Sequence, residues 1–228
     1  MTAAAATKKS RTQGRPDSGA GVGRDALVAA AIEELRTTAP EALTLRGVAA
    51  RADVHPALIR YYFGNKDGLL REVVQTLVDQ AQAAARASIE SNAPVQAKLA
   101  QRLNNMIELT RANPHFHRLV LDKVYGQADA NEGRDLLGHM ATRGMRLTVA
   151  MLHDEPAPAL RQVDPRFLHV AMIGLTEFFA GAQPLLQELF GDDADFDDLK
   201  KRYVAFLSDL ILHGIAAPAE EAPGTPPQ

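Results

Sequence analysis

Apolar residues recur every three or four positions along most of the chain, and almost no stretch alternates between apolar and polar residues. Two examples of this spacing are Leu27, Ala30, Ala31 and Leu35, and Leu69, Val73, Val74 and Leu77. Such spacing gathers apolar side chains on one face of a helix. The pattern therefore predicts an all-α protein.

Residues that start and stop helices divide this pattern into nine expected helices. Pro40 ends the first, because a residue that precedes proline is disfavoured in helical geometry. Thr44 and Asn65 are expected N-caps of the second and fourth helices, and Pro56 suits the first position of the third. The first four expected helices span about residues 24–38, 44–52, 56–63 and 66–90. The fifth begins at Pro94 and the sixth at Pro114. The last three span about residues 130–153, 165–188 and 196–215. Three short helices thus precede six mostly longer ones.

The second and third helices have the dimensions of a helix-turn-helix, with the motif spanning residues 44–63. The tight turn between them contains Asp53. Asp is among the few residues other than glycine that tolerate the left-handed backbone conformation such a turn often needs. We therefore expect Asp53 to have a positive φ.

The third helix is expected to have one buried and one exposed face. Helical periodicity places Ile59 and Phe63 toward the core and Ala57, Arg60 and Tyr61 toward the surface. The exposed face fits the major groove of B-DNA, where Arg can pair with guanine and apolar groups can meet thymine methyls. Alternatively, Arg60 and the neighbouring tyrosines form only an amphipathic boundary against the rest of the protein.

Charge is distributed unevenly along the chain. Residues 1–70 hold ten Lys and Arg against seven Asp and Glu, a balance of +3, so the net charge of −3 leaves −6 for the remainder. A basic front joined to an acidic body suits a chain whose first part meets nucleic acid. Residues 1–23, which include QGRP at 13–16, are expected to form a disordered basic arm that either contacts DNA or stays solvated. Residues 216–228 are expected to be a disordered tail.

The stretch LVAAAIEELRTTAPEALTLRGVAARADVHPALIRYYFGNKDGLL, residues 27–70, resembles without gaps the DNA-binding domain of the TetR/AcrR family of transcriptional regulators. The resemblance implies a domain over residues 24–66 that contacts DNA through Thr44, Arg46, Pro56, Ala57, Leu58, Arg60, Tyr61, Tyr62 and Lys66. The chain departs from the family pattern at several positions. His55 stands where Ser is common, which should weaken the N-cap of the third helix, and Arg60 stands where Tyr is common.

Beyond residue 70 the similarity is weaker. The stretches NPHFHRLVLDKVYG and VDPRFLHVAMIGLTEFFAGAQPLLQELFG are similar to the C-terminal domains of the subset that includes the pyrimidine-pathway regulators. This similarity implies a six-helix effector-binding and dimerisation domain over residues 67–215, with the last two long helices pairing across a two-fold axis. The helix over 66–90 would join it to the DNA-binding domain.

The resemblance favours a ligand-responsive homodimeric regulator, in particular a repressor that leaves a palindromic DNA operator when a small-molecule effector binds. The alternatives are a DNA-binding factor without a ligand and an all-helical enzyme. A cavity of several hundred Å³ in the C-terminal domain would favour the first of the three. The effector itself is not identifiable, and its candidate contacts are polar or flexible side chains on largely apolar helices: His117, Arg118, Tyr125, Met145 and Glu177.

Other kinds of site find little support in the sequence. His115 and His117 would point in nearly opposite directions on a helix, and the acidic run GDDADFDDL lacks the ligand spacing of a calcium loop. No catalytic signature or phosphate loop is present, and the chain contains no cysteine. No run of residues is apolar and long enough for a membrane span. We therefore expect a cytoplasmic protein that has no metal, no cofactor, no catalytic residue and no membrane contact.

Overall fold

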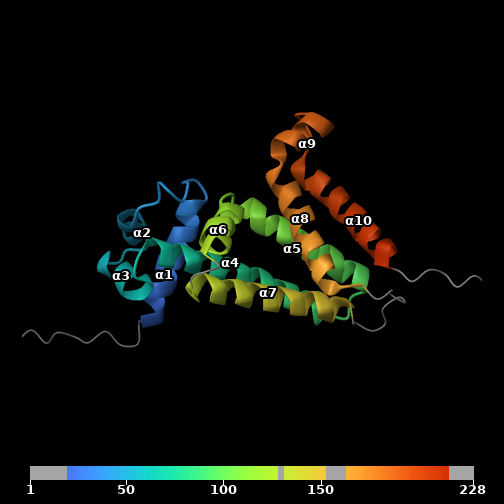
Figure 1. Ribbon diagram of the computed structural model, residues 1–228. Helices are drawn as coiled ribbons and strands as arrows, with labels where there is room; N and C mark the ends of the chain where they lie inside the picture. Colours follow the sequence, from blue (N-terminus) through green and yellow to red (C-terminus); the bar gives the residue numbers. More distant parts are fainter. Residues whose placement is uncertain (1–19, 128–130, 153–162, 216–228) are drawn as a thin grey trace, which may run out of the picture.

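The computed structural model describes residues 20–127, 131–152 and 163–215, which form ten α-helices, one short 3₁₀ helix and no strand (Figure 1). The elements are α1 (Ala20–Leu35), α2 (Leu45–Arg51), α3 (Ala57–Phe63), α4 (Lys66–Ile89), α5 (Val95–Ala112), α6 (Phe116–Lys123), η1 (Tyr125–Gln127), α7 (Asn131–Leu152), α8 (Pro165–Gly181), α9 (Gln183–Phe190) and α10 (Phe196–Ile215). The all-α prediction is confirmed. The QGRP sequence and the predicted C-terminal tail lie outside the described residues.

Two predicted helices differ from those in the structure. The first helix begins at Ala20, within the predicted arm, and ends at Leu35 instead of Thr38. The single helix predicted over 165–188 was wrong, because the chain breaks at Ala182 into α8 and α9. Pro184 explains the break, since proline has no amide hydrogen and its ring would collide with the carbonyl of residue 180 in a continuous helix. The six helices predicted from residue 66 onward are therefore seven among the described residues.

The first three helices pack into a small core around apolar side chains that are almost fully buried: Leu27, Ala31, Val48, Ala49 and Ile59. The predicted turn is confirmed, because Asp53 has a φ of 52°. The two predicted caps are also confirmed. The Thr44 hydroxyl accepts from the amide of Gly47 at 3.1 Å, and the Asn65 side-chain oxygen accepts from the amide of Gly68 at 2.9 Å.

Helix α4 belongs to both halves of the molecule, with α1–α3 grouped at one end and α8–α10 at the other (Figure 1). It contacts α1, α3, α5, α6 and α7. Leu69, Leu70, Val73 and Val74 are buried in one apolar cluster with α1–α3. That cluster continues past the predicted domain boundary into α6. A second cluster joins α5, α8, α9 and α10.

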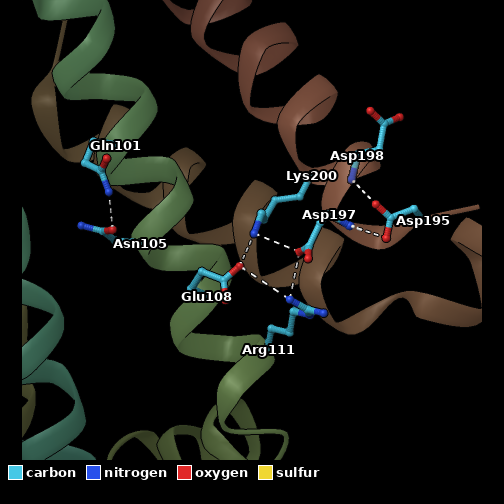
Figure 2. Close-up of polar contacts among 8 residues, drawn as sticks. All are labelled: Gln101, Asn105, Glu108, Arg111, Asp195, Asp197, Asp198 and Lys200. Atoms are coloured by element: carbon cyan, nitrogen blue, oxygen red, sulfur yellow. Dashed lines mark hydrogen bonds and ion pairs between the residues drawn. The ribbon is translucent and has the colours of Figure 1, made fainter.

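A network of charged side chains attaches the start of α10 to α5 (Figure 2). Lys200 donates to Glu108 and, at 3.2 Å, to Asp197, which also accepts from Arg111 at 3.0 Å. The hydrogen bond and charge of Lys200 hold the pKa of Asp197 below its usual value. Asp195 accepts hydrogen bonds from the amides of residues 197 and 198. The acidic run therefore caps a helix and joins two helices.

We expect Asp53→Val to lower the free energy of unfolding by about 1–2 kcal/mol, because a β-branched residue is disfavoured at the positive φ of this turn. Asp53→Gly is the matched control, since glycine adopts the same conformation without steric cost and should stay within about 1 kcal/mol of wild type. Urea unfolding of the three proteins measures both effects. Equal stability of the valine and glycine variants would contradict this account.

Candidate DNA-binding face and effector cavity

Helix α3 presents an exposed face, and residues at the start of α2 are exposed as well. Tyr61 is 78% exposed, and Ala57 and Arg60 are also exposed. Ile59 is fully buried beneath them. Phe63, predicted to be core, is only partly buried, and the guanidinium of Arg24 lies 5.6 Å from its ring centroid.

The predicted DNA contacts differ in accessibility. Six of the nine are exposed: Thr44, Arg46, Pro56, Ala57, Arg60 and Tyr61. Leu58 and Tyr62 are partly buried, and both pack against α1 close to Gly23. Lys66 is also partly buried, and its ammonium donates to the carbonyl oxygen of Glu41 at 2.9 Å. These three side chains therefore attach α3 and the start of α4 to α1 and to the loop that follows α1.

Two arginines on this face are available for an anionic partner. Within the described part of the chain, neither Arg46 nor Arg60 forms an ion pair or a side-chain hydrogen bond. Other arginines nearby are paired, as Arg24 is with Glu72 at 2.7 Å and Arg51 with Glu34 at 3.5 Å. A guanidinium that is exposed and unpaired can take a phosphate or a guanine edge without first breaking an internal contact.

His55 precedes α3 and makes a hydrogen bond to the first residue of that helix. Its Nδ1 accepts a hydrogen bond from the amide of Ala57 at 3.2 Å, as the oxygen of a capping Ser would. The N-cap residue itself, Pro56, makes no side-chain hydrogen bond, and the expected weakening of the cap stays a prediction.

A cavity of about 280 Å³ lies between α4, α5, α6, α7 and α8. Most of its wall is apolar, with contributions from Val78, Ala81, Met106, Leu137, Met140 and Ile173. The cavity reaches Phe116 and Val120 on α6 and Tyr125 in η1. A concave, mostly apolar hollow with a few polar groups is the usual form of a small-molecule site.

The candidate effector residues from the sequence are not all at this cavity. Tyr125 and Glu177 line it, and burial, followed by the negative charge of Glu177, raises the pKa of Tyr125. His117 lies beside an adjacent open hollow, and its Nδ1 is 2.9 Å from the Glu177 carboxylate. Arg118 and Met145 do not line the cavity.

Arg118 instead connects α6 to the DNA-binding domain. Its guanidinium lies 2.7 Å from the carboxylate of Glu41, in the loop between α1 and α2. Lys123, also on α6, pairs at 2.7 Å with Asp67 in the first turn of α4. Phe116 is buried in the same apolar cluster as α1 and also lines the cavity. Helix α6 thus contacts the cavity on one side and the DNA-binding domain on the other.

A second polar group at the cavity was missed by the sequence analysis. Arg102 is only 4% exposed, and its Nη2 donates to the carbonyl oxygen of Gly144 and the hydroxyl of Thr148, each at 3.0 Å. The same nitrogen lies 3.4 Å from Nδ1 of His169. Arg102 follows Leu99 by three positions and precedes Met106 by four, so its place on the apolar stripe of α5 was a signal in the sequence.

The environment keeps Arg102 charged and His169 neutral at pH 7. Burial lowers the pKa of Arg102 to about 10, which still leaves the guanidinium protonated. Burial, together with the positive charge of Arg102, lowers the pKa of His169 to about 4. Gly144 is needed for this close packing, because a Cβ there would lie 2.8 Å from two atoms of the His169 ring.

The described residues contain no group of three or more His, Asp or Glu side chains placed to hold a metal ion. Within the same residues, no helix has the length and apolar character needed to cross a membrane.

Two family models match the chain. One, described as bacterial regulatory proteins of the tetR family, matches residues 27–73. The other, described as a tetracyclin repressor-like C-terminal domain, matches residues 92–221. No curated protein matches the chain in sequence.

Several solved structures share the fold. A protein of unknown function from Rhodococcus sp. RHA1 has a TM-score of 0.66 at 17% identity, over 91% of this chain and 100% of that one. A transcriptional regulator from Rhodococcus sp. Rha1 has a TM-score of 0.64 at 15% identity, over 86% of this chain and 99% of that one. The transcriptional regulator FadR from Bacillus subtilis, in complex with stearoyl-CoA, has a TM-score of 0.59 at 16% identity, over 84% of this chain and 98% of that one. At such low identities the likeness shows the fold alone.

We expect His169 to make the folded chain less stable in acid. The unfolded chain binds a proton at His169 near pH 6.5, whereas the folded chain does so only near pH 4. The free energy of unfolding should therefore fall as the pH is lowered from about 6.5 to about 4. Urea unfolding at pH 7.5 and pH 4.5 should show a larger loss for wild type than for His169→Gln. Equal losses in the two proteins would contradict the shift.

Proposed function

The chain belongs to the TetR family of bacterial regulatory proteins, and we propose that it is a dimeric repressor that binds a palindromic operator and is released from it by a small molecule. Family membership makes the chain a DNA-binding transcriptional regulator. The observation that carries the effector half of the proposal is the largely apolar cavity of about 280 Å³. A filled core would instead have favoured a DNA-binding factor without a ligand.

In this proposal α3 lies in the major groove of each half-site. Arg60 would read the edge of one base, and Ala57 and Tyr61 would contact the bases next to it. Arg46 would contact the DNA backbone or a base at the margin of the groove. The amides at the start of α4 would face a phosphate. Lys66 would support this arrangement by holding the loop between α1 and α2 through the carbonyl of Glu41.

The effector would act through the two helices that contact both the cavity and the DNA-binding domain. Helix α4 lines the cavity with Val78 and Ala81 and packs against α1 and α3. Helix α6 lines it with Phe116 and Val120. An effector that binds better when either helix has moved would favour that conformation. In the proposed dimer, the two α3 helices would then be at a distance that does not match the half-sites, and the affinity for DNA would fall. In the Bacillus subtilis neighbour, the same fold is seen in complex with stearoyl-CoA.

Dimerisation is supported by the large apolar side chains that α8, α9 and α10 leave exposed. They are Phe167, Val170, Leu175, Phe178, Leu185, Leu189, Phe190, Phe206 and Leu210. The adjacent Phe179 is buried and stacks on Tyr203 with ring centroids 4.0 Å apart, so only one of the two neighbouring phenylalanines belongs to the core. An apolar surface of this extent on a monomer marks an interaction site, and a two-fold axis would let the surface cover itself.

The DNA half of the proposal is tested by selecting binding sites for the full chain from a random duplex library. We expect a palindromic site whose half-site centres lie about one helical turn of DNA, or a multiple of it, apart. Arg60→Ala should relax selection at one symmetric pair of positions and cost about 1–3 kcal/mol of affinity for the selected site.

Arg86→Ala is the matched control for lost charge, because Arg86 is an exposed arginine at the far end of α4. It should leave site preference unchanged. Equal weakening of the Arg60→Ala variant on the selected site and on random DNA would show that Arg60 contacts only the backbone. If no palindromic site were selected, this result would count against binding of a dimer to a palindromic operator.

We expect Phe206→Glu to weaken self-association by about 2 kcal/mol or more, because it places a charge in a surface that the dimer would bury. Light scattering over a dilution series measures the dimer dissociation constant. The control is Leu121→Glu, which adds the same charge at an exposed leucine on α6, away from α8–α10. A wild-type chain that is monomeric at micromolar concentration, or a Phe206→Glu variant that dimerises normally, would refute the proposed interface.

A further inference from the structure

The buried guanidinium at one end of the cavity has no negative partner. Only Nη2 of Arg102 is hydrogen-bonded, to Gly144, Thr148 and His169, and all three of these partners are neutral. Within the described residues, Nε and Nη1 are buried without an acceptor. Burying a cation is costly unless a counter-charge or several hydrogen bonds compensate for its lost hydration. An anion bound beside these two nitrogens would therefore offset the cost of burying the guanidinium.

The groups around Arg102 can donate to such an anion. His169 is neutral, and Thr148 carries a hydroxyl. Gln82 donates to the carbonyl oxygen of Met140 at 3.3 Å, and its own Oε1 is buried without a partner. Rotation of this amide can present either its oxygen or its nitrogen to a ligand. The net charge of this end of the cavity is thus one positive unit, from Arg102.

Resting on the proposed function of the cavity as an effector site, we propose that the effector is a monocarboxylate with an apolar body, whose carboxylate pairs with Arg102. A carboxylate matches the planar fork of a guanidinium and can accept two parallel hydrogen bonds from it. Its single negative charge balances the single positive charge. A phosphate monoester, which carries closer to two charges at neutral pH, would leave one unbalanced inside a largely apolar cavity.

The opposite end of the cavity sets the direction in which such a ligand binds. Glu177 lies eight residues after His169 on α8, about 12 Å further along the helix. Its negative charge disfavours a carboxylate at that end. Between the two ends the wall is formed by apolar side chains such as Met106, Met140 and Ile173. The ligand's apolar body would therefore extend from Arg102 toward Tyr125.

Binding would also change a contact between helices. Nε and Nη1 are covered by neighbouring atoms, so the side chain of Arg102 or its neighbours must shift to admit the carboxylate. Arg102 is on α5, and two of its acceptors, Gly144 and Thr148, are on α7. A shift of Arg102 toward the ligand would weaken this link between α5 and α7, and α7 packs against α4.

The test is calorimetric titration of the full chain, without DNA, with octanoate and 4-phenylbutyrate and with their neutral amides. We expect at least one acid to bind, and its amide to bind at least tenfold more weakly. Octyl phosphate tests the charge balance and should bind more weakly than octanoate. Failure of both acids to bind, equal binding of acid and amide, or tighter binding of octyl phosphate would each overturn the proposal. These comparisons use the wild-type chain alone and do not depend on the folding of a variant.

A charge-removing variant then assigns the contact to one residue. Arg102→Met should weaken binding of the acid by about 30-fold or more and leave binding of the amide unchanged, whereas Arg102→Lys should retain part of the preference for the acid. Arg111→Met is the control, because Arg111 is on the same helix but outside the cavity. Folding of each variant is checked by circular dichroism. Acid binding that is unchanged in Arg102→Met would refute the role of Arg102.

Release of DNA is measured separately. The acid that binds in calorimetry is added to the complex of the chain with its selected operator. Acid binding without release would contradict the proposed function and leave the assignment of the cavity intact. Release by another compound, with no acid bound, would support the proposed function and overturn the carboxylate inference.

Discussion

The burial of α4 on several sides is the constraint on which the rest of the structure depends. A helix whose apolar residues face only one neighbour can move as a unit, but α4 contacts helices of both halves of the molecule. Leu70 and Val74 are packed with the DNA-binding helices, and Val78 and Ala81 line the cavity. Since closely packed side chains do not deform continuously, a displacement at one end of this helix requires repacking at the other.

Helix α6 makes the coupling between the two halves more direct. It is only eight residues long, yet Phe116 and Val120 line the cavity while Arg118 and Lys123 pair with carboxylates of the α1–α2 loop and the start of α4. These ion pairs are at least partly exposed, and such pairs contribute little to stability. Their value lies in orientation, because they connect a wall of the cavity to the segments on either side of α2 and α3.

The cavity combines two features that a stable core would avoid together. Its volume costs packing energy, and it encloses an arginine without a counter-charge. Replacing both by closely packed apolar side chains would favour the unliganded fold. Both lie at the meeting point of α4, α5, α7 and α8. In the proposed function a bound anion would satisfy Arg102 better, and this difference between states would make the protein respond to its ligand.

The sequence by itself determined the helical class, the helix-turn-helix and the identity of its exposed face. These depend on short-range rules: apolar spacing, the caps Thr44 and Asn65, and the positive φ of Asp53. The break at Pro184 was equally local and could have been predicted. Only the tertiary structure decided the cavity, because its walls come from five different helices. Arg102 and His169 become a polar pair, and Arg118 becomes a contact with the DNA-binding domain, through the packing angles of those helices, which no local pattern specifies.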